Sequence, residues 1–91
     1  SIHKINYENK KNQDKKIRKI ASTIKKLEKQ IDNFEKDLEK INKLMSDPKT
    51  FKESSKDPNF FKEYEKKQLK LKKMEKDWEE LNIELERLNH L

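Results

Sequence analysis

The stretch that decides the fold is IRKIASTIKKLEKQIDNFEKDLEKINKLM, which spans Ile17–Met45. Its apolar residues follow one another at alternating intervals of three and four, and almost all residues between them are polar or charged. The repeat consists of Ile17, Ile20, Ile24, Leu27, Ile31, Phe34, Leu38, Ile41 and Met45. Because this spacing averages 3.5 residues, it places the nine side chains on one narrow strip of an α-helix, and a second helix must cover that strip.

A second repeat with the same spacing follows downstream and can supply the covering helix. It consists of Phe60, Tyr64, Lys67, Leu71, Met74, Trp78, Leu81, Leu85 and Leu88, with one polar member, Lys67. In an antiparallel pair, Met45 lies opposite Phe60 and Ile17 lies opposite Leu88, and all nine layers match without a shift. The sequence therefore predicts an all-α fold, an antiparallel two-helix coiled-coil hairpin with a short helical turn at its tip.

Two Asp-Pro pairs mark the tip of the predicted hairpin. The residue before a proline avoids helical dihedral angles, whereas Asp caps a helix and Pro suits its first position. The pairs at 47–48 and 57–58 predict a first helix over about 15–45, a tip over 46–58 and a second helix over about 59–89.

Residues 1–14 do not follow the repeat. Their apolar residues alternate with polar ones, which predicts an extended lead-in ahead of a hairpin over 15–91, with Asp14 as the N-cap of the first helix. Ile83 is an apolar residue of the second helix that falls outside the repeat. It is either an isolated surface residue or a contact for Ile5 and Tyr7, if the lead-in folds back over the hairpin.

Composition excludes several classes of function. The chain of 91 residues has no Gly and no Cys, which excludes Gly-rich phosphate loops, disulfides and thiolate metal sites. Its two histidines, His3 and His90, have no acid, cysteine or serine arranged around them in the sequence, and a hairpin offers no cleft. We therefore predict no enzymatic activity, no metal site and no cofactor.

The chain contains no signal peptide and no long apolar run, so we expect a cytoplasmic protein without membrane contact. Because its first residue is not Met, we interpret the chain as a piece of a larger protein.

The net charge of +6 is concentrated at the start of the chain. Residues 1–30 hold ten basic and three acidic residues, whereas residues 31–91 hold 14 basic and 15 acidic ones. This imbalance indicates a polyanionic partner, and the abundance of Lys favours phosphate contacts over base reading. The predicted nucleic-acid-binding residues are Lys4, Lys10, Lys11, Lys15, Lys16, Arg18, Lys19, Lys25, Lys26 and Lys29.

The alternative interpretation of these charges is the ordinary solvated face of a coiled coil. The predicted pairing places four acids of the second helix beside Lys19, Lys25 and Lys26, where they would weaken the basic patch. These acids are Glu79, Glu80, Glu84 and Glu86.

Three short motifs resemble the C-terminal domain of ABC-F ATP-binding proteins, especially of their Uup branch. Lys4-Ile5-Asn6-Tyr7 with Lys11 is similar to that domain's K-L-S-Y-x-x-x-R opening. Leu44-Met45-Ser46-Asp47-Pro48 with Phe51 resembles its L-x-x-D-P-x-x-F/Y turn, and Asp77-Trp78-Glu79-Glu80-Leu81 resembles its E-R-W-E-E-L ending. The chain departs from the family at Asn12 and Gln13, where an acidic residue and Leu are favoured.

This resemblance implies a helical hairpin appended to two ATP-binding cassettes. ATP would then bind to the cassettes of the parent protein, and no cofactor is implied for this segment. The Uup branch of the domain is associated with DNA binding, and ABC-F proteins act on ribosomes. The implied partners are therefore DNA or ribosomal RNA, together with the parent's own cassettes.

Two functions from different classes follow. The first is a nucleic-acid-binding coiled-coil domain that contacts the phosphate backbone without marked sequence preference. The second is a protein-interaction or spacing arm that docks on the parent cassettes or the ribosome through apolar Leu69, Ile83 or Phe61. In both cases we expect a monomer.

Overall fold

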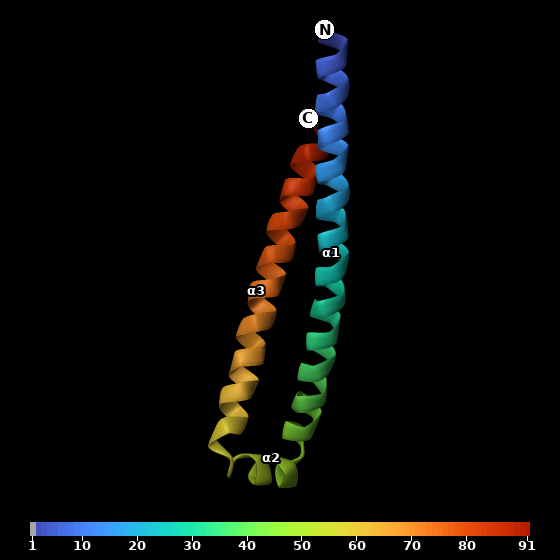
Figure 1. The fold of residues 1–91 in the computed structure, drawn as a ribbon. Coiled ribbons are helices and arrows are strands. Elements are labelled where there is room, and N and C mark those ends of the chain that lie inside the picture. The colour runs from blue at the N-terminus through green and yellow to red at the C-terminus, as the bar shows by residue number, and fades with distance from the viewer. Residues whose placement is uncertain (1) are drawn as a thin grey trace.

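The computed structural model of the chain describes residues 2–91, which form a long helical hairpin (Figure 1). Helix α1 (Ile2–Ser46) and helix α3 (Pro58–Asn89) run antiparallel, and the short helix α2 (Pro48–Ser54) connects them at the tip. The molecule measures 73 × 18 × 15 Å, so it is about as thick as two helices side by side. The predicted all-α antiparallel hairpin with a short helix at its tip is confirmed.

The two apolar repeats face each other, as predicted. Ile24, Leu38, Met74 and Leu88 are buried and form the core. Every other member of the two repeats is half-buried except Trp78, whose side chain remains 39% exposed. A strip between only two helices is open along both edges, which is why the core is thin and contains few fully covered side chains.

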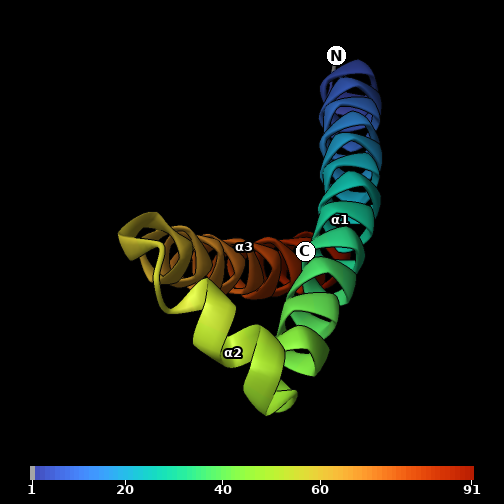
Figure 2. The ribbon, with the colours of Figure 1, turned by 90° about the horizontal axis from the view of Figure 1, so that it is seen from below.

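The two long helices are closest where α3 ends and separate toward α2. Figure 1 shows this divergence from the side, and Figure 2 shows from below that α2 bridges the ends of the two helices. The layer nearest the tip, Met45 with Phe60, is accordingly only half-buried. The two most buried residues, Ile24 and Leu88, lie in the upper part of the hairpin, and Leu38 remains buried nearer the tip.

Polar contacts between the helices agree with the predicted register. The Tyr64 hydroxyl donates to Oδ1 of Asn42 at 2.6 Å, one residue from its predicted partner Ile41. The Trp78 indole N–H donates to Oε1 of Glu28 at 3.1 Å, again one residue from its predicted partner, Leu27. These bonds lie 14 positions apart on each helix, so the register holds over four turns.

Both Asp-Pro pairs begin helices at the tip, as predicted. The Asp47 carboxylate accepts from the backbone N–H of Lys49 at 3.0 Å, and Asp57 accepts from that of Asn59 at 2.9 Å. Each following proline occupies the first turn, where its missing N–H costs nothing. The α3 helix begins at Pro58, one residue earlier than predicted.

The prediction of an extended lead-in is wrong for residues 2–14, because α1 is one continuous helix from Ile2. Asp14 lies inside this helix and caps nothing, while Ser1 lies outside the described residues. The segment contains no Gly or Pro that would interrupt a helix, and a short alternation of apolar residues is a weak signal beside the rest of the segment. The Gln13 amide also continues the contact with α3 by donating to the Leu88 carbonyl at 2.6 Å.

The lead-in does not fold back over the hairpin either. Ile5, Tyr7 and Ile83 remain 57%, 69% and 63% exposed, which excludes a mutual contact that buries them. All residues from Ile2 to Asn12 are exposed, and Figure 1 shows this end of α1 projecting beyond the end of α3.

The substitution Ile24→Ala tests the apolar strip. We expect it to lower the free energy of unfolding by about 2–4 kcal/mol, because Ile24 is only 5% exposed and faces the partner helix. The exposed Ile83 supplies the matched control, and Ile83→Ala should change that free energy by less than about 0.5 kcal/mol. Urea unfolding followed by circular dichroism measures both values, and equal losses would contradict the assignment of the core.

Candidate nucleic-acid interface

All ten residues predicted to contact phosphates lie on α1, and all ten side chains are exposed. They extend from Lys4 to Lys29, a rise of roughly 37 Å along the helix at 1.5 Å per residue. Because the segment before Asp14 is helical, Lys4, Lys10 and Lys11 belong to the same rigid rod as the later cations. The structure therefore fixes their relative positions along one axis.

Six of the ten residues form a single line on the face of α1 that points away from the apolar strip. Successive members are separated by 7, 4, 3, 7 and 4 residues, each close to a whole number of helical turns. The residues of this line, called the outer line below, are Lys4, Lys11, Lys15, Arg18, Lys25 and Lys29. The structure thus brings together more than half of the predicted site.

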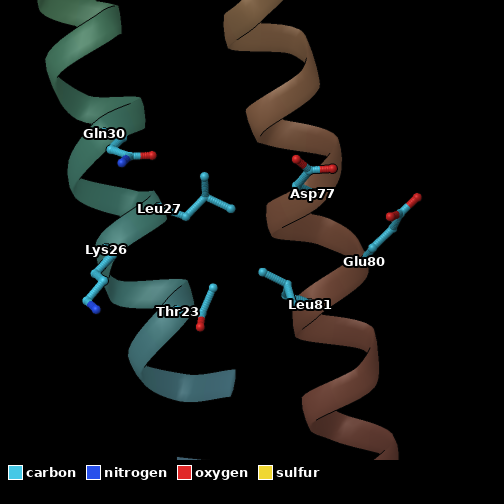
Figure 3. A pocket seen from close by; sticks show the side chains of 7 residues that line it. All are labelled: Thr23, Lys26, Leu27, Gln30, Asp77, Glu80 and Leu81. Atoms are coloured by element: carbon cyan, nitrogen blue, oxygen red, sulfur yellow. The ribbon is translucent and has the colours of Figure 1, made fainter. Parts of the chain in front are cut away.

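The other four predicted residues, Lys10, Lys16, Lys19 and Lys26, lie off the outer line. Lys16 is turned toward α3, where its charge contributes to lowering the pKa of Glu84. Lys26 lines a groove between α1 and α3 together with Glu80 (Figure 3). In that groove Leu27 and Leu81 point toward each other, whereas Lys26 and Glu80 point away from the gap.

The cations from Lys10 to Lys29 make no ion pair with any other described residue. Ion pairs occur further along the chain, and each joins residues three or four positions apart in the sequence, such as Lys36 with Asp32 at 2.9 Å. The other described pairs are Lys43–Glu39, Lys56–Glu53, Lys66–Glu63, Arg87–Glu84 and His90–Glu86. The basic half of α1 therefore presents its charges without internal neutralisation by such pairs.

The expected weakening of the basic patch by acids of α3 is seen in part, because Glu80 shares a groove with Lys26 and Glu84 interacts electrostatically with Lys16. Glu84 is engaged by Arg87, whose guanidinium donates to its two carboxylate oxygens at 2.6 and 3.0 Å. Glu79 lies on the opposite side of the hairpin, in a groove with Ile31 and Trp78, and Glu86 is within 3.9 Å of His90. Glu80 shares a groove with one of the three predicted neighbours, Lys26.

Two shallow grooves on α1 gather cations between Lys10 and Arg18. Both are lined by Lys11 and Arg18, one also by Lys15 and the other by Lys10. Each groove has one acidic residue at its edge, Glu8 or Asp14, so the local charge remains positive. Such a surface can attract an anion electrostatically, but it encloses no small molecule.

No group of His, Cys, Asp or Glu among residues 2–91 is arranged to hold a metal ion. None of the described helices is long and apolar enough to cross a membrane.

Comparison with protein families matches residues 11–82 to the family described as ABC transporter C-terminal domain. The chain belongs to this family. The domain is typical of ABC-F proteins, so the hairpin is a C-terminal domain of an ABC-type ATPase. The match includes the Asp-Pro tip and the Trp78 motif, while the Lys4–Tyr7 motif lies outside it. Neither the curated proteins nor the solved structures contain a significant match.

Sequence reasoning missed the groove on the other side of the hairpin, which contains Trp78 and a set of carboxylates. The signal was present, since Glu28, Glu35 and Glu75 all flank the apolar strip on the same side of the predicted pairing. Like charges at facing positions are unusual beside a coiled-coil seam, where opposite charges support the pairing.

The Glu84 carboxyl supplies a test of the charge arrangement. Its pKa lies below the ordinary value, chiefly because Arg87 hydrogen-bonds its charged form and to a lesser extent because Lys16 is near. The pairing therefore favours the folded state above the ordinary carboxyl pKa, and this contribution disappears as the pH falls through the lowered pKa. NMR titration of the side chain should show the pKa rising to its ordinary range in Arg87→Ala and rising less in Lys16→Ala. An unchanged pKa in Arg87→Ala would contradict the described contact.

Proposed function

We propose that this domain binds nucleic acid, DNA first of all, through phosphate contacts along α1. The observation that carries the proposal is the outer line of cations, exposed on a rigid helix and without ion-pair partners from Lys11 onward. A polyanion with evenly spaced charges is the ligand that such a line complements best.

The geometry suits a phosphate backbone better than a base sequence. The outer line extends over about 37 Å, and duplex DNA carries one negative charge per about 1.7 Å of its axis, so several phosphates lie within reach. Five of its six members are Lys, a flexible point charge, whereas bidentate base recognition relies on Arg, Asn or Gln. Binding without marked sequence preference is the expected result.

The resemblance to the Uup branch of ABC-F proteins supports DNA over ribosomal RNA as the main ligand. On this proposal the parent protein hydrolyses ATP in its cassettes in the cytoplasm, and the hairpin, as a monomer, supplies the nucleic-acid contact. Ribosomal RNA remains the natural competitor, because its phosphates carry the same charge.

A salt titration with a labelled DNA duplex tests the proposal. We expect affinity to fall steeply with salt, because each phosphate contact releases bound counterions. Replacing Lys15, Arg18, Lys19, Lys25 and Lys26 by Gln should weaken binding and reduce the slope of log K against log salt by up to about 4.5, at roughly 0.9 per lost contact. Circular dichroism should show that this variant keeps its helices.

A variant with the same charge change on α3 provides the control. It carries Gln at five exposed positions, Lys62, Lys66, Lys72, Lys73 and Lys76. We expect a clearly smaller loss of affinity and slope from this control, because its cations lie off α1. An unchanged slope in the α1 variant, or equal losses in both variants, would reject the proposed interface.

A second candidate function is a protein-docking arm, favoured by the exposure of apolar side chains outside the core. Leu69 is 60% exposed and Phe61 39% exposed. Binding through such residues survives high salt, whereas phosphate binding does not. A partner retained on the domain at high salt but lost after Leu69→Ser would identify this second function.

A further inference from the structure

The two sides of the hairpin carry different charges. The groove of Figure 3 mixes one cation, Lys26, with the carboxylates of Asp77 and Glu80. The groove on the other side has an apolar floor of Ile31 and Trp78, and its rim holds five carboxylates and no cation. These are Glu28, Asp32 and Glu35 from α1 and Glu75 and Glu79 from α3. This second groove is called the acidic groove below.

Three of the five carboxylates of the acidic groove have no partner among the described residues of the hairpin. Asp32 pairs with Lys36, and Glu28 accepts the indole N–H of Trp78. Glu35, Glu75 and Glu79 make no hydrogen bond or ion pair with any other described residue. The chain has six more cationic than anionic residues, so the acidic groove is a negatively charged region on a chain of net positive charge.

Folding does not account for this arrangement of charge. Glu75 and Glu79 lie four positions apart on α3, as do Glu28 and Asp32 on α1, and like charges at that spacing disfavour the helix. Glu28 and Glu75 also face the same groove from opposite helices. A cationic partner would relieve these repulsions on binding.

The floor of the groove indicates what kind of cation fits. Trp78 belongs to the apolar repeat, yet 39% of its side chain is exposed, with the indole held by Glu28. An exposed indole beside carboxylates suits a guanidinium, which stacks on the ring and forms paired hydrogen bonds with carboxylates.

The groove also continues along α3, which favours a chain over a single small cation. A further groove shares Trp78 and Glu79 with it and extends to Ile83 and Glu86. From Glu75 to Glu86 the two cover about 17 Å of helix axis, the length of several residues of a bound segment. Along this length acidic side chains alternate with exposed apolar ones.

We propose that the acidic groove binds an arginine-rich segment of a partner protein, with one guanidinium stacked on the Trp78 indole. The partner's remaining cations pair with the rim carboxylates, and its apolar atoms cover Ile83. This surface is separate from the outer line of cations on α1 and takes a ligand of opposite charge.

A second copy of this chain is a poorer occupant. Consider a two-fold symmetric dimer in which the basic start of α1 of each copy lies on the acidic groove of the other. The symmetry axis would then pass near Arg18, which is midway along α1 between the basic start and the acidic groove. There Lys15, Arg18 and Lys19 of both copies would meet, and like charges would oppose the dimer.

Trp78 is the only tryptophan of the chain, so its fluorescence reports directly on the groove. The probe is a blocked peptide of about twelve residues in which Arg alternates with Ala, titrated into the full chain at low salt. We expect a saturable change in Trp78 emission, because the stacked guanidinium changes the exposure of the indole. A peptide with Lys in place of Arg should bind several-fold more weakly, since an ammonium does not stack in the same way.

Two matched variants test whether the groove is the site. Glu75→Gln with Glu79→Gln removes two rim charges and should weaken the peptide on the order of tenfold. Glu65→Gln with Glu80→Gln changes the charge of α3 equally but outside the acidic groove, and it should weaken the peptide less than about threefold.

Four outcomes would overturn the proposal. The first is that Trp78 emission does not change on addition of the Arg peptide, and the second is that the two double variants lose equal affinity for it. The third is that spermine or the Lys peptide binds as tightly as the Arg peptide. The fourth is that the chain forms a dimer that Glu75→Gln with Glu79→Gln abolishes.

Discussion

The contact between the apolar strips of α1 and α3 is the interaction on which the rest of the structure depends. It is thin, with four buried side chains, and it is the only extended packing between the long helices of the described chain. Because the strip occupies one narrow face of each helix, it determines which residues of α1 point outward. The outer line of cations and the acidic groove are both consequences of this single alignment.

Charge is distributed around the hairpin in a way that packing does not require. The outer line lies opposite the apolar strip on α1, whereas the acidic groove lies along one edge of that strip. Exposed charges contribute little to the stability of a coiled coil, about 0–1 kcal/mol for a pair, so the fold tolerates either arrangement. Such segregation instead suits a domain that contacts a polyanion on one face and a basic protein segment on another.

Much of the fold could be predicted from the sequence because its main signals are periodic and local. The spacing of apolar residues fixed the two helices and their register, as the Asn42–Tyr64 and Glu28–Trp78 bonds confirm. The Asp-Pro pairs fixed the tip, since each carboxylate caps the helix that follows it.

The start of α1 and the acidic groove could not be predicted in the same way. Residues 2–14 have no apolar repeat, and their helix depends on the absence of breakers and on the contact of Gln13 with Leu88. The exposure of Trp78 could not be predicted from the spacing, because the repeat places this residue on the apolar strip and yet it remains 39% exposed. The sequence does identify the ten basic residues of the proposed interface. That all ten lie on one continuous helix is known only from the structure, in which residues 2–14 are helical and not extended.

Disulfide formation between paired positions tests the central alignment most directly. The chain has no cysteine, so Ile24→Cys with Leu81→Cys introduces a single possible bridge. The register places these positions opposite each other, and we expect rapid oxidation within a monomer under mild oxidant. The offset pair Ile24→Cys with Met74→Cys should oxidise slowly or only between molecules. If the offset pair oxidises readily within a monomer and the 24–81 pair does not, the alignment of α1 with α3 is wrong.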